Sequence, residues 1–244
     1  MVSFRLIACS FVLLAWNTGW GKTFDFNDPK GFNSIEFSLL GTIENGMLLG
    51  KISELNGLLE YDPKAPEKIT GTITALTRST KASVPEADAF LRGPSLFNVD
   101  HFPEINFTIK EAKNPRRIGN SVQLEVLGTL VIKDVNRSMT IPVRMNYLPG
   151  KLKARRGVEG DLLVIRSEFS IRRSDFDLGS GMFLKKVADE VKVELTLVGA
   201  APKKATVPVN PRSKVGLLPP RSKSSRDRKR RPQRRLRRSS VPLR

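Results

Sequence analysis

A two-residue alternation of apolar and polar side chains constrains the fold of this chain more than any other feature. It recurs in six runs between residues 22 and 201, at residues 34–39, 105–110, 122–126, 139–146, 163–170 and 191–197. Because successive side chains of a β-strand point to opposite faces, each run predicts a strand with one dry face and one solvated face.

Turn-forming residues separate these runs, at 44–46, 61–63, Pro149-Gly150 and Gly157. Short two-faced strands between such turns are typical of antiparallel sandwiches and barrels. Helical periodicity is scarce: residues 85–91 predict one short helix, and residues 181–187 at most a further turn or two. Strands do not alternate with long helices, so we expect an all-β antiparallel fold and no parallel doubly wound sheet.

The first 21 residues have the pattern of a secretory signal peptide. Arg5 and the free amine form a positive region, and residues 6–16 form an apolar run. Gly19 and Gly21 have the spacing of the −3 and −1 positions of a cleavage site. The apolar run is too short to span a bilayer, which needs about 20 residues. We therefore expect export, to the periplasm or the medium; a buried first strand or helix is the alternative.

Cys9 is the only cysteine, and it lies inside that apolar run. Residues 6–9 also resemble a lipoprotein processing box, so lipidation of Cys9 stays an alternative, although the apolar run before Cys9 is only three residues long and continues well past it. Removal of residues 1–21 would leave no thiol in the mature chain. Disulfides, thiolate catalysis and cysteine-ligated metals would then be excluded.

Residues 202–244 hold most of the positive charge. This segment has 16 Lys and Arg residues against one acid, a net charge of +15, whereas residues 1–201 have 26 against 23, a net charge of +3. It also has seven prolines and few large apolar residues. Such a composition cannot form a core, so we expect a disordered basic tail.

The basic tail is a candidate polyanion-binding segment, because guanidinium groups bind phosphates through charge and paired hydrogen bonds. For an exported chain the partners would be anionic membrane lipids and envelope polymers. Nucleic acid becomes the natural partner only if the chain is not exported. A solvated tail without a dedicated partner also stays open. The candidate residues are Arg228, Lys229, Arg230, Arg231, Arg234, Arg235, Arg237 and Arg238.

Four sequence blocks resemble the YceI-like proteins, which are bacterial, mostly periplasmic, lipocalin-like polyisoprenoid-binding proteins. Residues 90–107 are similar to the family's signature, with Phe-Leu-Arg at its start and Phe-Pro-Glu-Ile-Asn-Phe at its end. Residues 57–63, 127–135 and 169–176 resemble three further family blocks in the same order and spacing. The resemblance covers residues 23–199.

Three positions depart from the family pattern. Gly41 stands where the family often has histidine, Asp177 replaces a glycine, and Lys133-Asp134 replaces a glycine-containing turn. These departures bear on turn geometry and on individual ligand contacts more than on the fold.

The resemblance implies an extended eight-stranded antiparallel lipocalin-like β-barrel over residues 22–201, with a short helix, whose interior accepts an isoprenoid lipid or a quinone. Burial would drive such binding, at about 0.8 kcal/mol for each sequestered CH₂. The alternation shows which residues are dry, but a dry residue can equally be core filling. The interior candidates are Ile35, Phe37, Ile105, Phe107, Leu124, Met139, Ile141, Ile165, Phe169, Val193 and Leu195.

Little in the sequence indicates catalysis. No phosphate-binding glycine loop, metal-ligand cluster or nucleophile motif is present. His101 is the only histidine, and we expect it in a solvated turn. Arg173 and Asp175 would either form an ion pair at the barrel end or orient a polar headgroup. We therefore expect a non-enzymatic protein without a cofactor apart from a bound lipid; a homodimer stays open.

Overall fold

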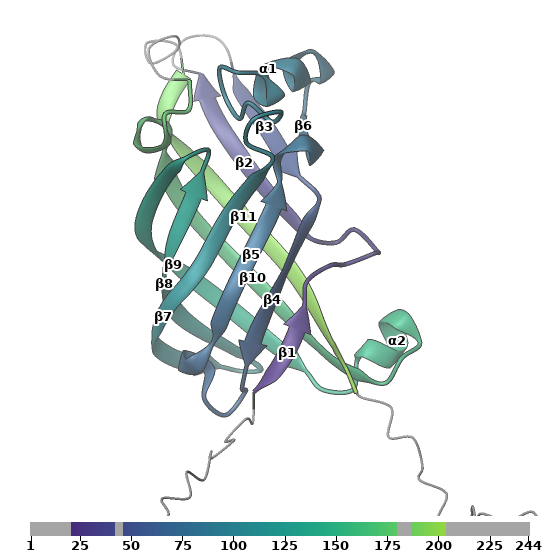
Figure 1. Ribbon diagram of the computed structural model, residues 1–244. Helices are drawn as coiled ribbons and strands as arrows, with labels where there is room; N and C mark the ends of the chain where they lie inside the picture. Colours follow the sequence, from purple (N-terminus) through teal and green to yellow (C-terminus); the bar gives the residue numbers. More distant parts are fainter. Residues whose placement is uncertain (1–20, 42–45, 180–186, 204–244) are drawn as a thin grey trace, which may run out of the picture. The chain divides into compact units, whose positions relative to one another are not determined.

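The computed structural model describes residues 21–41, 46–179 and 187–203, and these residues form a closed antiparallel β-barrel (Figure 1). The strands are β1 Lys22–Asp25, β2 Ser34–Gly41, β3 Met47–Ile52, β4 Leu55–Tyr61, β5 Thr70–Leu76, β6 Thr80–Ala82, β7 Glu104–Ile118, β8 Ser121–Ile132, β9 Val135–Leu148, β10 Gly160–Arg172 and β11 Val187–Pro202. The helices are η1 Pro66–Lys68, η2 Thr77–Ser79, η3 Pro85–Ala87, α1 Asp88–Arg92, α2 Leu152–Arg156 and η4 Arg173–Phe176.

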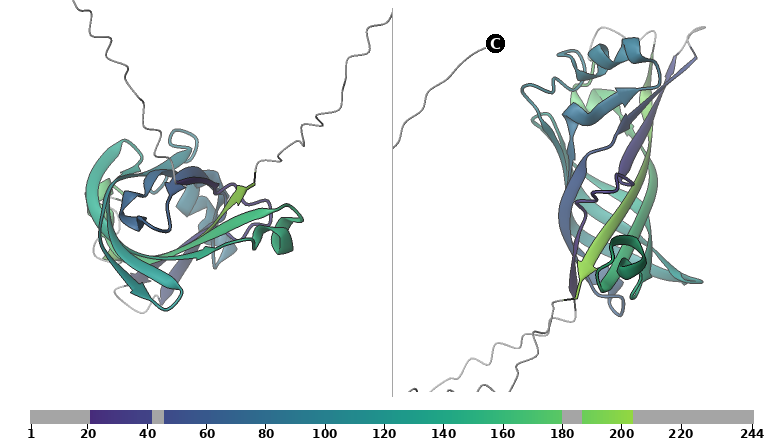
Figure 2. Two further views of the ribbon diagram at one scale, coloured as in Figure 1. Left: turned by 90° about the horizontal axis from the view of Figure 1, so that it is seen from below. Right: turned by 90° about the vertical axis from the view of Figure 1, so that its right-hand side faces the viewer.

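The eleven strands make up eight rows around the barrel. The segments β1 and β2, β3 and β4, and β5 and β6 are successive halves of three interrupted strands: β2 pairs with β3 and β3 with β6, while β1 pairs with β4 and β4 with β5. Strand β11 closes the ring by pairing with both β1 and β2. The strands form a ring in the view from below (Figure 2). The predicted eight-stranded antiparallel barrel is confirmed.

All six alternating runs are strands, and their dry faces point into the barrel. On β8, Val122, Leu124 and Val126 are buried whereas Glu125 is exposed. The predicted short helix at residues 85–91 is confirmed by η3 and α1. The second helical prediction, at residues 181–187, falls almost wholly outside the described residues.

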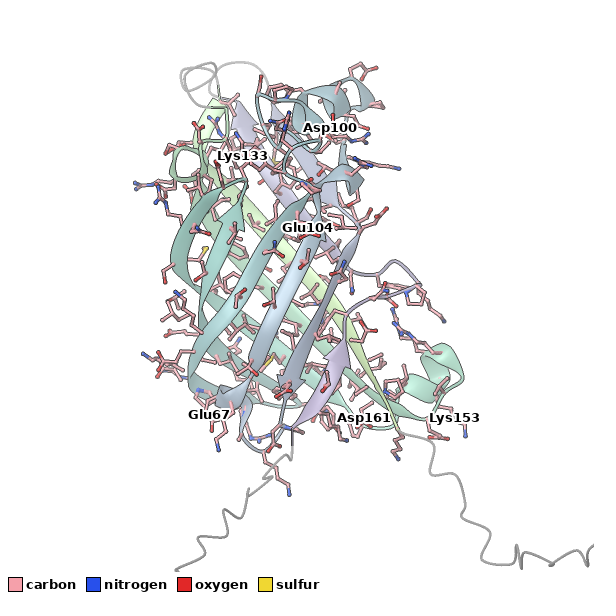
Figure 3. The ribbon with its side chains drawn as sticks, viewed as in Figure 1. Glu67, Asp100, Glu104, Lys133, Lys153 and Asp161 are labelled. Atoms are coloured by element: carbon pink, nitrogen blue, oxygen red, sulfur yellow. The ribbon has the colours of Figure 1, made fainter. Side chains whose placement is uncertain are left out.

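Helix α1 and the chain that follows it lie at one end of the barrel, at the top of Figure 1. Leu91 of α1 is fully buried, and Leu96, Phe97 and Val99 join the same core cluster. Apolar side chains from this connection therefore enter the α1 end of the barrel. Figure 3 labels Asp100 at this end and Asp161 at the other.

The opposite end, where β1 begins and β11 ends, is closed by aromatic rings and a polar cluster. Phe24 packs edge-on against Tyr61 and Tyr147, with ring centroids 6.3 Å apart in both pairs. Lys22 Nζ donates to the Asp161 carboxylate and to Tyr147 Oη (3.0 Å), and Tyr147 Oη donates to Asp161 Oδ2 (2.8 Å). Burial alone raises the pKa of Asp161, but the hydrogen bonds, that from Lys22 above all, bring the pKa below its ordinary value.

A surface ion cluster ties the loop between β1 and β2 to α2. The buried Asp28 carboxylate accepts from Arg155 Nη2 (2.6 Å), from Arg156 Nη2 (3.1 Å) and from the backbone N–H of Phe32 (3.0 Å). Gly157 ends α2 in the left-handed conformation, with φ 74°. This helix was not predicted, because Leu152 is its only buried residue and no apolar periodicity marks it in the sequence.

The expectations for residues 1–21 and 202–244 fall almost wholly outside the described residues and stay predictions. Among the described residues, no helix has the length and apolar character needed to cross a membrane.

Candidate functional site

Two adjoining apolar cavities occupy the inside of the barrel. The space between the lining atoms is about 620 Å³ in the first and about 500 Å³ in the second, and both figures include space open to solvent. Both are narrow, with a cavity volume of only about 80 Å³ each. Five residues line both cavities, which makes the two spaces neighbours: Ile35, Ile105, Leu130, Phe169 and Val193.

Eight of the eleven interior candidates line this space. Ile35, Ile105, Phe169 and Val193 line both cavities; Phe37 lines the first only, and the second is also lined by Phe107, Ile141 and Leu195. The other three, Leu124, Met139 and Ile165, line neither cavity. Leu124 and Ile165 are buried in the packed core, and Met139 packs half-buried against it.

Sequence reasoning missed several lining residues for identifiable reasons. Leu39 and Val191 lie in alternating runs that were identified, and Leu130 lies in one of the family-like blocks, so their signal was present. Leu96 and Phe97 come from the connection between α1 and β7, where no strand period exists to show which side chains turn inward.

Two phenylalanine rings lie flat against glycines in the barrel wall. A Cβ atom at Gly50 would come within 2.2 Å of Phe37 Cζ, and one at Gly128 within 2.3 Å of Phe107 Cζ. Gly50 is the direct strand partner of Phe37. Only glycine permits this approach, so the two glycines let the far edges of both rings lie against the wall.

Arg173 is the single charged residue that lines the first cavity. It is 2% exposed, and its three guanidinium nitrogens donate to backbone carbonyls: Nε to Ala188 (2.9 Å), Nη1 to Leu178 (3.0 Å) and Nη2 to Val187 (3.0 Å). The expected ion pair with Asp175 is wrong for the described residues, because Asp175 only accepts a bond from Arg137 at its backbone oxygen (2.9 Å). Arg173 thus fixes the start of β11 beside the cavity.

His101 lies in an exposed turn, as expected, with its backbone N–H bonded to Asn98 O (3.0 Å). In the described part of the chain, no group of three or more His, Cys, Asp or Glu side chains is arranged to hold a metal ion.

Two of the positions that depart from the family pattern, Lys133 and Asp177, have the left-handed backbone conformation that glycine favours. Lys133, in the turn between β8 and β9, has φ 57°, and Asp177 has φ 52°. Side chains with a Cβ adopt this left-handed region at a cost. Lys133 Nζ donates to Asp177 O (3.1 Å), so the two turns also contact each other. Gly41 is the last residue of β2.

Sequence comparison finds relatives among curated bacterial proteins. The chain is 26% identical over 147 residues to UPF0312 proteins of Yersinia pestis (strain Pestoides F) and of Yersinia pseudotuberculosis (serotype O:1b), a match that covers 59% of this chain and 73% of each relative.

Three solved structures have a similar fold. BcnA of Burkholderia cenocepacia matches with a TM-score of 0.53 at 20% identity, over 67% of this chain and 95% of BcnA. The YceI protein of Campylobacter jejuni matches with a TM-score of 0.51 at 16% identity, over 63% and 85%. A polyisoprenoid-binding domain from Saccharophagus degradans matches with a TM-score of 0.54 at 12% identity, over 75% and 99%.

The barrel therefore has the same fold as these three structures, and the sequence comparison points in the same direction. The model of the YceI-like domain matches residues 31–199, which is more than half of the chain. The chain belongs to the YceI-like family.

Proposed function

We propose that this protein sequesters or carries a long isoprenoid-type lipid, such as a polyprenyl compound or a quinone, inside its barrel, and that it acts by binding and not by catalysis. The observation that carries the proposal is the pair of adjoining cavities, whose lining is apolar apart from Arg173. The narrow bore suits an extended chain better than a wide ring system.

Burial supplies enough free energy for tight binding. Each five-carbon isoprene unit would contribute up to about 4 kcal/mol, at about 0.8 kcal/mol per carbon. Three units, the length of a farnesyl chain, would supply up to about 12 kcal/mol, which exceeds the roughly 8 kcal/mol of a micromolar complex before the loss of ligand motion is subtracted. Specific polar contacts are therefore unnecessary for affinity, and Arg173 is the one residue of the lining that could meet a polar end of the ligand.

The relatives support the proposal at the level of the family. The Saccharophagus degradans neighbour is described as a polyisoprenoid-binding domain, and at 12% identity it shares the fold with this chain. The inference of a similar ligand rests on the combination of family, barrel and apolar lining. Export to the periplasm or the medium is part of the proposal and rests on the N-terminal sequence pattern.

The direct test is extraction of the protein purified from its native host. Native mass spectrometry should show a mass above that of the polypeptide, and organic extraction should release a polyprenyl compound or a quinone. Repeated recovery of an empty protein, together with no binding of a dansyl-labelled farnesyl chain in vitro, would refute lipid carriage.

A second candidate is a polyanion-binding or nucleic-acid-binding protein that acts through its tail, with the barrel as scaffold. The charge of residues 202–244 favours it. Removal of these residues should then abolish binding to anionic vesicles or nucleic acid, whereas filling the barrel should leave that binding intact. For a lipid carrier, by contrast, binding of the farnesyl chain should survive removal of residues 202–244.

A further inference from the structure

The barrel wall is incompletely paired between two neighbouring strands. β9 and β10 form ladder pairs only from Arg144–Arg166 to Leu148–Leu162. Toward the α1 end both strands continue, and each keeps pairing with its other neighbour, β9 with β8 and β10 with β11. Residues 135–143 and 167–172 therefore face each other without ladder pairs, although both strands are fully described.

Pro142 marks the point where the pairing stops. The N–H and C=O of one strand residue point toward the same neighbouring strand. Pro142 O accepts a hydrogen bond from Ser167 Oγ of β10 at 2.6 Å, so the carbonyl of Pro142 points toward β10. A backbone N–H at this position would point toward β10 as well, and proline has none to donate. The side chain of Ser167 thus bonds to β9 just beyond the last ladder pair, and we call this hydrogen bond the clasp.

Two grooves follow the unpaired seam on the outside. One surrounds the clasp and has about 1210 Å³ of open space; it is lined by Pro142–Arg144 and Arg166–Glu168 and also extends to Asn114 and Arg116 of β7 and to residues 123–125 of β8. The other has about 1100 Å³ and lies between Arg137–Met139 and Ser170–Arg172. Ile171 lines this second groove and also the first internal cavity. The side chain of Ile171 therefore lies between the inside of the barrel and this groove.

The two ends of the barrel offer less direct access. At the end labelled by Asp161 in Figure 3, the rings of Tyr61 and Tyr147 and the cluster of Lys22 and Asp161 cover the interior. At the α1 end, Leu91 and the segment that follows it pack into the core.

We propose that the seam between residues 135–143 and 167–172 is a lateral portal, through which the apolar chain of the lipid enters and leaves the barrel. This inference rests on the proposed lipid-binding function. Met139 and Ile171 give the portal an apolar floor, and the rim is polar, with Arg137, Arg172 and Glu190 along the second groove. Opening requires the loss of no backbone ladder pair; the hydrogen bonds that oppose it come from side chains, namely the clasp and, at the α1 end of the seam, those of Arg137 to Asp175 O and of Lys133 to Asp177 O.

A cross-link across the seam tests the portal. In a Cys9→Ser background, Ser138→Cys and Ser170→Cys, both exposed, would be joined by a bifunctional maleimide. The matched control joins Ser138→Cys to Thr129→Cys, its direct partner on the paired strand β8. The association rate of the dansyl-labelled farnesyl chain, measured by stopped flow, should fall about tenfold or more in the first protein only, as expected when a gating motion is blocked.

A second variant opens the portal in place of closing it. Ser167→Ala removes the clasp and should speed association about fivefold, the factor that corresponds to about 1 kcal/mol for one neutral hydrogen bond. Ser79→Ala is the control, since Ser79 Oγ also donates to a backbone carbonyl, Leu76 O (2.7 Å), away from the seam.

The outcomes separate the two proposals. If the unmodified protein binds the probe, and neither the seam cross-link nor Ser167→Ala changes the association rate relative to its control, the portal is wrong and the lipid-binding function stands. If the cross-linked variant does not fold, the rate of Ser167→Ala alone decides. If the unmodified protein binds no probe, the proposed function fails and the portal fails with it.

Discussion

Filling the barrel at Val193 should abolish most of its capacity for an apolar chain. Val193 lies on β11, is buried, and lines both internal cavities. Its direct strand partners are Phe37 on β2 and Phe169 on β10, so a larger side chain at this position cannot move sideways along the wall. The indole ring of Val193→Trp should therefore occupy the space where the two cavities adjoin.

The magnitude follows from the length of chain that is displaced. A ligand confined to one cavity would lose the burial of about one isoprene unit, or about 4 kcal/mol. That loss corresponds to an increase in Kd of between about 100-fold and 1,000-fold. Overpacking should cost the folded protein about 1–3 kcal/mol, which thermal unfolding would measure separately.

Fluorescence titration with the dansyl-labelled farnesyl chain measures Kd. Lys192→Trp is the matched control, because Lys192 is the exposed neighbour of Val193 on the same strand. A surface substitution should change Kd by about twofold or less. A folded Val193→Trp protein that binds the probe as tightly as the unmodified protein would show that the ligand does not occupy the barrel.

Three further predictions concern stability. Asp28→Asn should lower the free energy of unfolding in urea by about 2 kcal/mol, because it leaves two partly exposed guanidinium groups without their carboxylate. Burial raises the pKa of Asp28, but hydrogen bonds, led by that from the Phe32 backbone N–H, bring it below its ordinary value. This stabilisation is therefore present above the unfolded-state pKa of about 3.9 and is lost as pH falls through the lower folded-state pKa. Over that pH range the urea midpoint of Asp28→Asn should change less than that of the unmodified protein. Arg173→Met should cost about 3 kcal/mol or more in the same assay, since three carbonyls lose a charged donor; a cost below about 1 kcal/mol would show that water replaces the guanidinium. Asp177→Gly should raise the melting temperature by the equivalent of about 0.5–1 kcal/mol, because glycine adopts φ 52° without strain; an unchanged melting temperature would contradict this account.

The parts of the fold that were predictable from sequence are those with a local signal. The runs on β8 and β10 show which side chains point inward, because alternation is a property of the strand itself. The sequence of β3 does not show this alternation, because Leu48 and Leu49 are adjacent. Leu49 is exposed and lies on an outer face that carries apolar residues.

The environment of Arg173 depended on distant residues and was not predictable. Its three carbonyl partners come from residues 178, 187 and 188, and the choice between them and Asp175 is set by how η4 meets the start of β11. The seam did leave a trace in the sequence. A proline within an alternating run indicates a strand edge, and Pro142 lies in the alternating run at residues 139–146, so the signal for the seam was present in the sequence.

The contact between Phe37 and Gly50 has a consequence for how related barrels can diverge. A methyl group at position 50 would push the ring inward and reduce the capacity of the barrel, although residue 50 does not itself line the cavities. Two homologues with identical lining residues could therefore hold chains of different length because of one residue in the wall behind them. We therefore expect ligand preference in such barrels to depend on these glycines as well as on the side chains that line the cavities.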